Sequence, residues 1–257
     1  MRNVTADDYD AADRAVLPVG TDYPDGFVLD WHSHRRAQFL YSATGVMVVE
    51  TRDGTWTVPT DLAVLIPPGV RHLMRTQDVS TRSLYIEPAA VPWWPSRCTV
   101  VQVTPLLREL LLVAVDFDVD YDSAGREGAV TSLLLHEIAA LAPLALHVAL
   151  PAAPDLALLC REYLGSPDVR IGNVQWAARL NLSERAFNRR FRAETGTSPA
   201  IWRRRARLLA AVPMLRSASV TDVAGRLGYA TPAAFTAAFT SEFGLPPSRM
   251  SRRGQLG

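Results

Sequence analysis

The 257-residue sequence has no lysine, only two cysteines and no uninterrupted apolar run of membrane-spanning length. All 27 basic residues are arginine, a bias that we attribute to genome composition and give no functional weight. Cys98 and Cys160 lie in different halves of the chain and have no metal-ligand spacing. This scarcity excludes a cysteine metal site and is typical of a reducing cytosol.

Two further absences concern targeting. The N-terminal residues are polar and acidic and lack the apolar centre of a signal peptide. The most apolar stretch, residues 133–150, is interrupted by two histidines, Glu137 and Pro143, so it makes a poor membrane span. We therefore expect a cytoplasmic protein without a membrane partner.

Charge divides unevenly between the two halves of the chain. Residues 155–257 hold 16 arginines against 7 acids, a net charge of +9, whereas residues 1–154 hold 11 against 19, a net charge of −8. A basic half beside an acidic half predicts one module for a polyanion and one with other duties. With 48% hydrophobic residues, the chain can bury one large core or two ordinary ones.

The basic half contains one pattern twice. In each copy a cap residue opens a helix that carries two phenylalanines four residues apart, and a glycine and a proline follow the helix. Phe187 and Phe191 of the first copy correspond to Phe235 and Phe239 of the second. Two such helix-turn-helix units in tandem predict DNA binding.

The first unit is predicted over about residues 173–194, after a helix over residues 155–164. Val174, Ala177, Ala178 and Leu180 indicate its first helix, and Ser183 caps its second helix. With both phenylalanines inward, the outward face of the second helix carries Arg185, Asn188, Arg189 and Arg192. Arginine and asparagine are the residue types that read guanine and adenine edges in the major groove. An ordinary basic surface explains neither the repeat nor the neighbouring Arg203–Arg207 run.

The second unit is predicted over about residues 220–243. A helix over residues 198–216, which Pro213 is expected to kink, joins it to the first unit. Its recognition helix opens at Thr231 and presents, at offsets equivalent to those of the first unit, Ala233, Thr236, Ala237 and Thr240. The predicted DNA-binding set consists of these four residues, their four counterparts and the two caps. We expect the first unit to supply most of the base discrimination and the second to act mainly as a positioning clamp.

Short strands rich in β-branched and aromatic residues dominate the acidic half from about residue 27 to residue 103. Turn residues separate them. The clearest strands are residues 46–49, 56–58, 62–66 and 83–86. Many short strands at regular spacing predict a β-sandwich or barrel, so we expect residues 1–103 to form a sensor barrel.

Three of the five histidines lie in this predicted barrel. His32 and His34 are two residues apart, so on one strand both side chains point to the same face. Gln38 follows on the next strand, and His72 is expected on a strand across the barrel. Three imidazoles and an amide oxygen make a plausible site for a borderline divalent ion. A ligand pocket lined by hydrogen-bonded histidines without metal explains the pattern equally well.

Residues 104–142 change to a helical period. Thr104 caps a helix with Pro105 at its first position, and a second helix follows a polar break. The pair either covers the open end of the barrel or forms a dimer interface. Residues 104–150 are therefore assigned to a helix pair and linker, with a domain boundary at the proline-containing segment 151–154.

Residues 155–250 resemble the DNA-binding domain of the AraC/XylS family of bacterial transcription regulators, within an expected domain of residues 155–252. The matching residues are Ser183, Phe187, Arg189, Phe191, Gly196, Ser198, Pro199, Arg207, Leu208, Ala211, Val223, Ala224, Gly228, Tyr229, Phe235, Phe239, Phe243, Gly244 and Pro246. The resemblance implies two helix-turn-helix units in successive major-groove turns. The family often has arginine where Ala237 stands.

The histidine segments resemble the two motifs of the cupin (jelly-roll) superfamily, a common companion of this DNA-binding domain. In metal-bearing cupins, the positions that match His32, His34, Gln38 and His72 are the ligands. This chain departs at Gln38, where glutamate is commoner, and at Asp61, where the second motif usually begins with glycine.

The sequence thus predicts an α+β protein of two domains, a cupin-type β-barrel with a helix pair followed by an all-α domain with two helix-turn-helix units. We expect a sequence-specific transcription regulator that binds double-stranded DNA as a homodimer and contacts RNA polymerase. A small molecule or a metal ion (zinc, nickel or iron) in the barrel is the expected effector.

Two alternatives stay open. One is a cupin metalloenzyme, such as a dioxygenase or isomerase, with an accessory helical domain. The other is a regulator for which the ion itself is the signal. No general base accompanies the histidines, and the tandem repeat is the more specific pattern, which favours a regulator over an enzyme.

Overall fold

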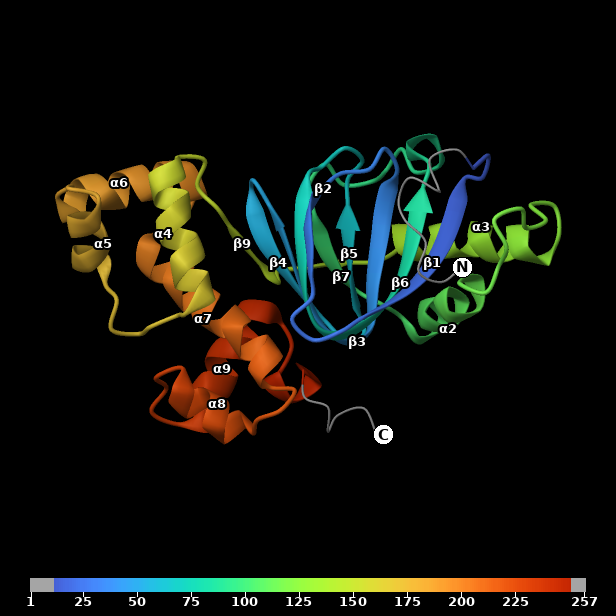
Figure 1. The fold of residues 1–257 in the computed structure, drawn as a ribbon. Coiled ribbons are helices and arrows are strands. Elements are labelled where there is room, and N and C mark those ends of the chain that lie inside the picture. The colour runs from blue at the N-terminus through green and yellow to red at the C-terminus, as the bar shows by residue number, and fades with distance from the viewer. Residues whose placement is uncertain (1–11, 251–257) are drawn as a thin grey trace. The chain divides into compact units, whose positions relative to one another are not determined.

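The computed structural model describes residues 12–250 and divides the chain into two compact units. Unit 1 consists of Met1–Thr51 and Trp56–Leu144, and unit 2 of Arg52–Thr55 and Ala145–Gly257 (Figure 1). The polar N-terminal residues 1–11 and the expected end of the DNA-binding domain at residue 252 lie outside the described residues. Unit 1 is rich in strands and unit 2 is helical, which confirms the predicted two-domain α+β class.

Antiparallel strands form the framework of unit 1. They are β1 (Val16–Tyr23), β2 (Val28–His32), β3 (Ala37–Thr51), β4 (Gly54–Pro59), β5 (Leu62–Ile66), β6 (His72–Ile86), β7 (Thr99–Gln102) and β8 (Pro143–Leu144). Their order in the sheet is β1-β6-β3-β5-β7-β8, and β2 also pairs with β6. The two central strands, β3 and β6, are 15 residues long each and pair along most of their length.

Strand β1 was not predicted from the sequence. It contains Pro18 and Gly20, two residue types that are depleted in strands. Because β1 is at the end of the sheet order, Pro18 lies in an edge strand, where a missing N–H is tolerated. The predicted segments 46–49 and 83–86 proved to be parts of longer strands. Register shifts between Ser42 and Val46, and a positive φ at Asp78, interrupt the regular alternation there.

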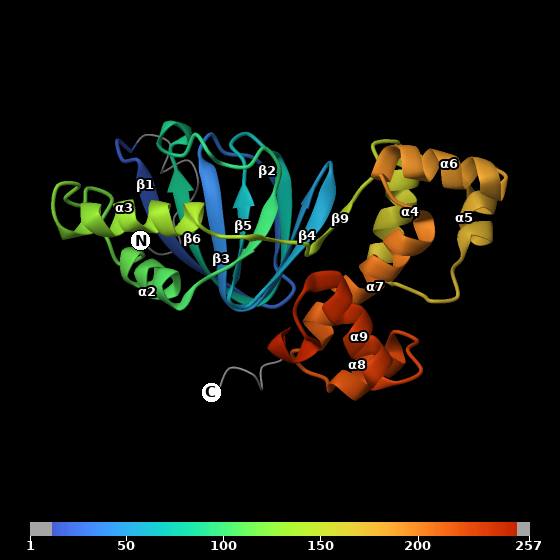
Figure 2. The same ribbon diagram turned by 180° about the vertical axis from the view of Figure 1, so that it is seen from behind.

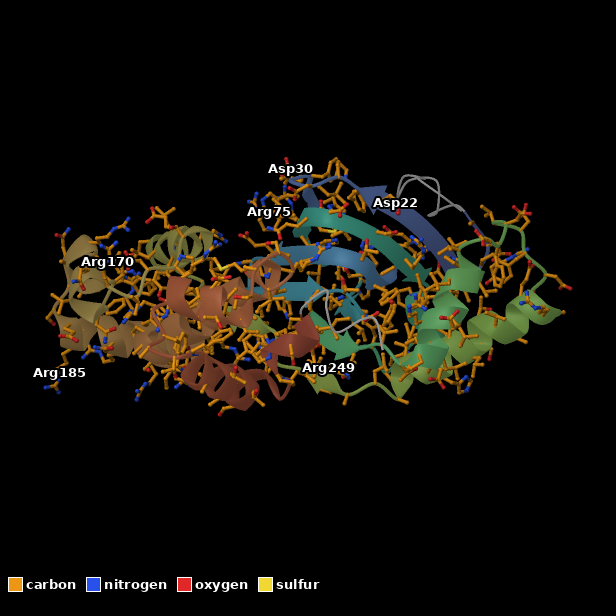
Figure 3. The ribbon with its side chains drawn as sticks, turned by 90° about the horizontal axis from the view of Figure 1, so that it is seen from below. Asp22, Asp30, Arg75, Arg170, Arg185 and Arg249 are labelled. Atoms are coloured by element: carbon orange, nitrogen blue, oxygen red, sulfur yellow. The ribbon has the colours of Figure 1, made fainter. Side chains whose placement is uncertain are left out.

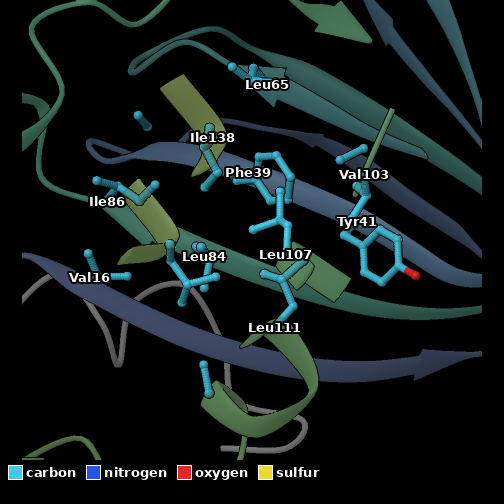
Figure 4. Close-up of a cluster of buried hydrophobic side chains, with 14 of the residues drawn as sticks. Val16, Phe39, Tyr41, Leu65, Leu84, Ile86, Val103, Leu107, Leu111 and Ile138 are labelled. Atoms are coloured by element: carbon cyan, nitrogen blue, oxygen red, sulfur yellow. The ribbon is translucent and has the colours of Figure 1, made fainter. Parts of the chain in front are cut away.

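Two helices cover one face of this sheet, α2 (Pro105–Ala114) and α3 (Arg126–Ala139) (Figure 2). Thr104 caps α2, and its hydroxyl accepts the N–H of Leu107 at 3.1 Å, as predicted. The sheet face and the helices share one core, which includes Phe39, Tyr41, Leu84, Ile86, Leu107, Leu111, Leu134 and Ile138. Figure 4 shows a large part of this core. The helix pair is therefore part of the sheet domain.

Two tight turns position the central strands. Gly45 has a φ of +81°, and a Cβ on it would lie 2.2 Å from the carbonyl oxygen of Asp78. Asp61 has a φ of +64°, and its carboxylate accepts a hydrogen bond from Tyr41 at 3.3 Å. Aspartate is one of the few non-glycine residues that tolerate this left-handed region. Asp61 thus takes the backbone conformation for which glycine is the usual residue.

Helices make up most of unit 2. They are α4 (Pro154–Gly165), α5 (Asn173–Arg179), α6 (Glu184–Thr195), α7 (Pro199–Met214), α8 (Val220–Arg226), α9 (Pro232–Phe243) and the 3-10 helix η2 (Pro247–Met250). The short strand β9 (His147–Ala149) precedes them, and the Leu150 N–H donates to the Asp53 carbonyl at 3.0 Å. Among residues 12–250, no helix is both long and apolar enough to cross a membrane.

Four helix starts and two helix ends in unit 2 have a local cause. Ser183, Ser198, Ser219 and Thr231 are N-caps whose side-chain oxygens accept the backbone N–H three residues later. Gly196 and Gly244 end α6 and α9 in the left-handed conformation, with φ of 72° and 73°. Pro213, which was expected to kink α7, lies in its last turn.

Replacing Gly45 with alanine is expected to lower the free energy of unfolding by about 2–4 kcal/mol, because the left-handed backbone is strained and the new Cβ meets the Asp78 carbonyl. Gly69→Ala is the matched control, since its φ is +73° but no atom lies within 4 Å of the new Cβ. It should cost only about 1 kcal/mol. Urea unfolding measures both, and equal losses would contradict the role of the close approach.

Candidate nucleic-acid interface and ligand site

The two predicted helix-turn-helix units share the same turn. In the first unit, α5 and α6 are joined through Asn181, whose φ is 54°, and the Leu182 N–H donates to the Ala177 carbonyl at 2.9 Å. In the second, α8 and α9 are joined through Gly228, whose φ is 79°, and the Tyr229 N–H donates to the Ala224 carbonyl at 2.9 Å. The second helices carry the phenylalanine pairs, which are fully buried with ring centroids 5.7 Å apart in both units.

The first unit has a larger aromatic core than the sequence indicated. Trp176 of α5 lies 6.0 Å from Phe187, 5.9 Å from Phe191 and 6.0 Å from Trp202 of α7, between ring centroids. Val174, one of the apolar residues that indicated this helix in the sequence, is 63% exposed. A seven-residue helix is too short for its apolar spacing to determine which face is buried, so the surrounding rings decide it.

Three arginines of α6 are exposed and unpaired within the described residues. Arg185, Arg189 and Arg192 are exposed, and within the described residues their guanidinium groups have no hydrogen-bond or ion-pair partner. Figure 3 shows the Arg185 side chain pointing away from the ribbon. Arg190 is different, because it lies 2.7 Å from the Asp155 carboxylate and 3.6 Å from that of Glu194. We call Arg185, Arg189 and Arg192 the α6 arginine face.

Asn188 does not share this free face, contrary to the sequence prediction. Its side-chain oxygen accepts a hydrogen bond from Asn173 at 3.0 Å, and its amide nitrogen donates to the Glu184 carbonyl at 2.9 Å. The side chain is half-buried between α5 and α6. Both of its polar atoms are therefore engaged within the unit.

The arginines of the basic run on α7 all have partners within unit 2, although Arg204 is exposed. Arg203 is buried, and Arg207 donates to the Tyr163 hydroxyl at 3.0 Å. Arg204 and Arg205 each lie 3.1 Å from the Glu242 carboxylate of α9. In the sequence analysis this run supported a DNA-binding surface. Its partners show that these arginines also connect helices within unit 2.

The exposed face of α9 carries no charge. Ala233 and Ala237 are exposed, and Thr236 and Thr240 are half-buried. No charged residue occurs from Thr231 to Ser241 in the sequence. The second helix-turn-helix unit therefore presents methyl and hydroxyl groups where the first presents guanidinium groups.

Hydrogen bonds from α7 also hold the segment that precedes α4. The Trp202 indole N–H donates to the Ala149 carbonyl at 2.6 Å, and Arg205 donates to the carbonyls of His147 and Ala145. This segment, residues 145–150, connects the sheet domain to the helical domain in the sequence. The helix between the two helix-turn-helix units is thus also the anchor of the linker.

The three histidines of unit 1 converge, although not by the predicted geometry. Strand β2 ends at His32, so His34 lies in the connection to β3 and not on the same strand. His72 begins β6 and is the direct antiparallel partner of His32, and therefore lies beside it rather than across a barrel. The ring centroids are 4.2 Å apart for His32 and His72, 5.2 Å for His34 and His72, and 6.2 Å for His32 and His34.

Each of these rings is oriented by a backbone carbonyl. Nδ1 lies 2.8 Å from the Asp30 oxygen in His32, 2.6 Å from the Arg36 oxygen in His34 and 2.9 Å from the Val70 oxygen in His72. Because a carbonyl only accepts, Nδ1 is the protonated nitrogen of His32 and of His72. Their Nε2 lone pairs are then available, as in metal-binding histidines with a fixed outer contact. His34 differs, because its Nε2 lies against the Gln38 side-chain oxygen, a second acceptor.

Gln38 joins this group from β3, and two residues that the sequence did not single out join it from β6. The Gln38 side-chain oxygen lies 3.1 Å from Nε2 of His34, and its nitrogen donates to the Tyr85 hydroxyl at 3.1 Å and the Ser83 hydroxyl at 3.5 Å. Gln38 and Tyr85 are direct partners in the β3–β6 register, a relation that only the sheet pairing reveals.

The three histidines and Gln38 are residue types that can bind a divalent ion, but their spatial arrangement is not that of a formed metal site. Burial, followed by the neighbouring His32 and His34, lowers the pKa of His72 to about 3, so its imidazole is neutral at pH 7. Zn–N bonds of about 2.1 Å would place ring centroids roughly 5 Å apart, within the observed spread. However, among residues 12–250 no three His, Cys, Asp or Glu side chains are grouped so as to hold a metal ion.

The fold and the two sites define a class of protein, a DNA-binding regulator with a separate ligand-binding domain. The family model of the AraC-like ligand binding domain matches residues 18–159, more than half of the chain, and that of a helix-turn-helix domain matches residues 176–253. The chain therefore belongs to the AraC family of transcription regulators.

Individual relatives agree with this assignment. The chain is 29% identical over 248 residues to the HTH-type transcriptional regulator NimR of Escherichia coli (strain K12), covering 95% of this chain and 89% of that protein. It is 37% identical over 89 residues to the HTH-type transcriptional activator RhaS of Escherichia coli (strain SE11), covering 33% of this chain and 32% of that protein.

Similar solved structures include ToxT from Vibrio cholerae strain SCE256 bound to an unsaturated fatty acid, with 10% identity and a TM-score of 0.37 over 93% of this chain and 95% of that one. They also include the DNA-binding domain of AdpA in complex with a target DNA. That domain has 33% identity and a TM-score of 0.34 over 38% of this chain and 89% of its own.

Proposed function

We propose that this AraC-family regulator recognises its DNA sites chiefly through the first helix-turn-helix unit. The observation that carries this proposal is the contrast between the α6 arginine face and the uncharged face of α9. An arginine can make a bidentate contact to guanine worth about 1–3 kcal/mol of discrimination. Alanine and threonine offer only methyl contact with thymine and single hydroxyl bonds. The second unit then acts as a positioning clamp with a preference for A·T pairs.

The sheet domain is the sensor in this proposal. Its candidate site combines His34, Gln38, Ser83 and Tyr85, which are polar groups fixed by their own hydrogen bonds. A small molecule with matching donors and acceptors is the effector class that such a group favours. The response travels along residues 145–150, because this linker is bonded directly to α7. The matched relatives are regulators, which favours this role over a cupin metalloenzyme.

The remaining parts of the proposal concern partners and place. A regulator of transcription acts on double-stranded DNA together with RNA polymerase, and so in the cytoplasm of a bacterial cell. Half-sites read by a pair of chains are the common arrangement for helix-turn-helix proteins, which supports a homodimer.

A divalent ion is the second effector that we propose. The fixed Nδ1 atoms of His32 and His72 support it, since they leave two Nε2 lone pairs available, and the His34 ring lies 5.2 Å from that of His72. A neutral amide oxygen from Gln38 adds no charge, so the affinity for zinc, nickel or iron is expected to be modest. An ion here would draw the rings into a common coordination sphere.

Selection of binding sites from a random DNA library tests the main proposal. We expect two half-sites of unequal information content, because α6 presents three exposed guanidinium groups and the exposed face of α9 presents none. Thr236→Ala should weaken binding only mildly. Two half-sites of equal information content would overturn the ranking of the two units.

Two adjacent arginines of α6 provide a matched pair of variants on the selected site. Arg189→Met is expected to weaken specific binding by about tenfold or more and to relax base preference in the stronger half-site. Arg190→Met removes the same charge from a side chain that is bonded to Asp155, so it should change affinity by no more than about threefold. Titrations at several salt concentrations measure both. Equal effects would show that only charge matters.

Metal analysis of the purified chain tests the second effector. Combined His32→Ala and His72→Ala substitutions are expected to abolish binding of zinc, nickel or iron. His136→Ala is the control, because that histidine lies on α3 and contacts the Ser132 carbonyl. Unchanged metal stoichiometry in the double variant would show that the assignment is wrong. A wild-type chain that binds none of the three ions would leave the small-molecule effector standing.

A further inference from the structure

Arg203 is the most unusual charged residue of the helical domain. The residue is only 5% exposed, and its guanidinium carbon lies 4.8 Å from the centre of the Trp176 ring. No carboxylate of residues 12–250 lies within ion-pair distance of it, and its buried Nη1 atom has no hydrogen-bond partner. It is a buried cation whose main compensation is an aromatic face.

The other end of this guanidinium starts a chain of hydrogen bonds that reaches α6. Nη2 of Arg203 donates to the Asn173 side-chain oxygen at 2.6 Å. The Asn173 amide nitrogen donates to the Asn188 side-chain oxygen at 3.0 Å, and the Asn188 nitrogen donates to the Glu184 carbonyl at 2.9 Å. We call this chain the Arg203 relay. It connects α7, the first residue of α5 and the middle of α6.

Stability alone does not account for Arg203. A buried ion without a counter-ion is costly, and an apolar side chain of similar size is often neutral or stabilising in such a place. The aromatic rings around Trp176 already pack α5, α6 and α7 together. The hydrogen bond of the Arg203 guanidinium makes the packing of these helices depend on their orientation. Hydrogen bonds weaken steeply with angle, whereas packed rings tolerate small rotations and shifts.

We propose that Arg203 is a positioning residue for base recognition, which acts through Asn173 and Asn188 to fix the rotation and axial position of α6. The inference rests on the proposed reading role of the α6 arginine face. Arg189 is the next residue after Asn188, so a rotation that the relay prevents would move its side chain directly. Bidentate contacts require placement to a fraction of an ångström, and the relay supplies that constraint without touching DNA.

Two variants of the full-length chain each remove a different hydrogen bond of the Arg203 relay. Arg203→Met removes the donor and the buried charge. Asn173→Asp keeps an acceptor for Arg203 but loses the N–H group that donates to Asn188. For both, the ratio of affinities for the selected site and for single-base variants in the stronger half-site is expected to fall about tenfold. Affinity for a scrambled duplex and the salt slope of Arg203→Met should stay unchanged, because Arg203 contacts no phosphate.

Arg204→Met is the matched control, one residue further along α7. It removes the same charge, but its partner is Glu242 of α9, so discrimination in the stronger half-site should persist. Thermal unfolding distinguishes positioning from folding. Arg203→Met is expected to keep or raise Tm while it loses discrimination.

Three results would overturn the inference. One is full discrimination in both relay variants, and another is an equal loss in the Arg204→Met control. The third is a salt slope lowered by about one in Arg203→Met, which would indicate a direct phosphate contact. Arg189→Met, measured in parallel, distinguishes failure of the positioning role from failure of the proposed reading role. If it lowers discrimination and the relay variants do not, only the positioning role is wrong. If it too leaves discrimination intact, the proposed reading role fails and the inference fails with it.

Discussion

Trp202, near the start of α7, is the residue around which the first helix-turn-helix unit is assembled. Its ring lies about 6 Å from those of Tyr163 in α4, Trp176 in α5 and Phe191 in α6, and its indole N–H holds the linker at Ala149. One buried side chain thus touches three helices and the segment that leads to the sheet domain. Because burial of a large aromatic ring is among the strongest stabilising contributions in a core, these elements are held together as one body.

The two units differ despite their shared pattern. The second unit has Val223 on the inner face of α8, and its rings come from Tyr229, Phe235, Phe239 and Phe243. It presents no guanidinium from α9, and its one acidic side chain there binds Arg204 and Arg205 of α7. The repeat therefore preserves the frame of a helix-turn-helix unit, while the surface chemistry of each copy has diverged.

Net charge is a poor guide to the DNA surface of this domain. The basic half of the sequence carries +9, yet many of its arginines are paired or buried. Arg190 is bound to Asp155, Arg203 packs on Trp176, and Arg205 bridges the linker and Glu242. The α6 arginine face differs from these residues, because its guanidinium groups have no partner within the described chain. In the sheet domain, backbone carbonyls hold all three histidine rings, and in His32 and His72 they define which nitrogen is protonated.

The sequence by itself determined the features that depend on residues close together in the chain. A cap and the N–H that it accepts are three residues apart, and the two phenylalanines of each pair are four apart. The repeat and its capped helix starts could therefore be predicted from the sequence. Sheet pairing decided the histidine group, because His72 reaches His32 only through the β2–β6 register. Tertiary packing decided which arginines are free, since Arg190 finds Asp155 from 35 residues away and Arg203 finds Asn173 from 30. Burial and charge pairing are set by such distant partners, and no local pattern records them.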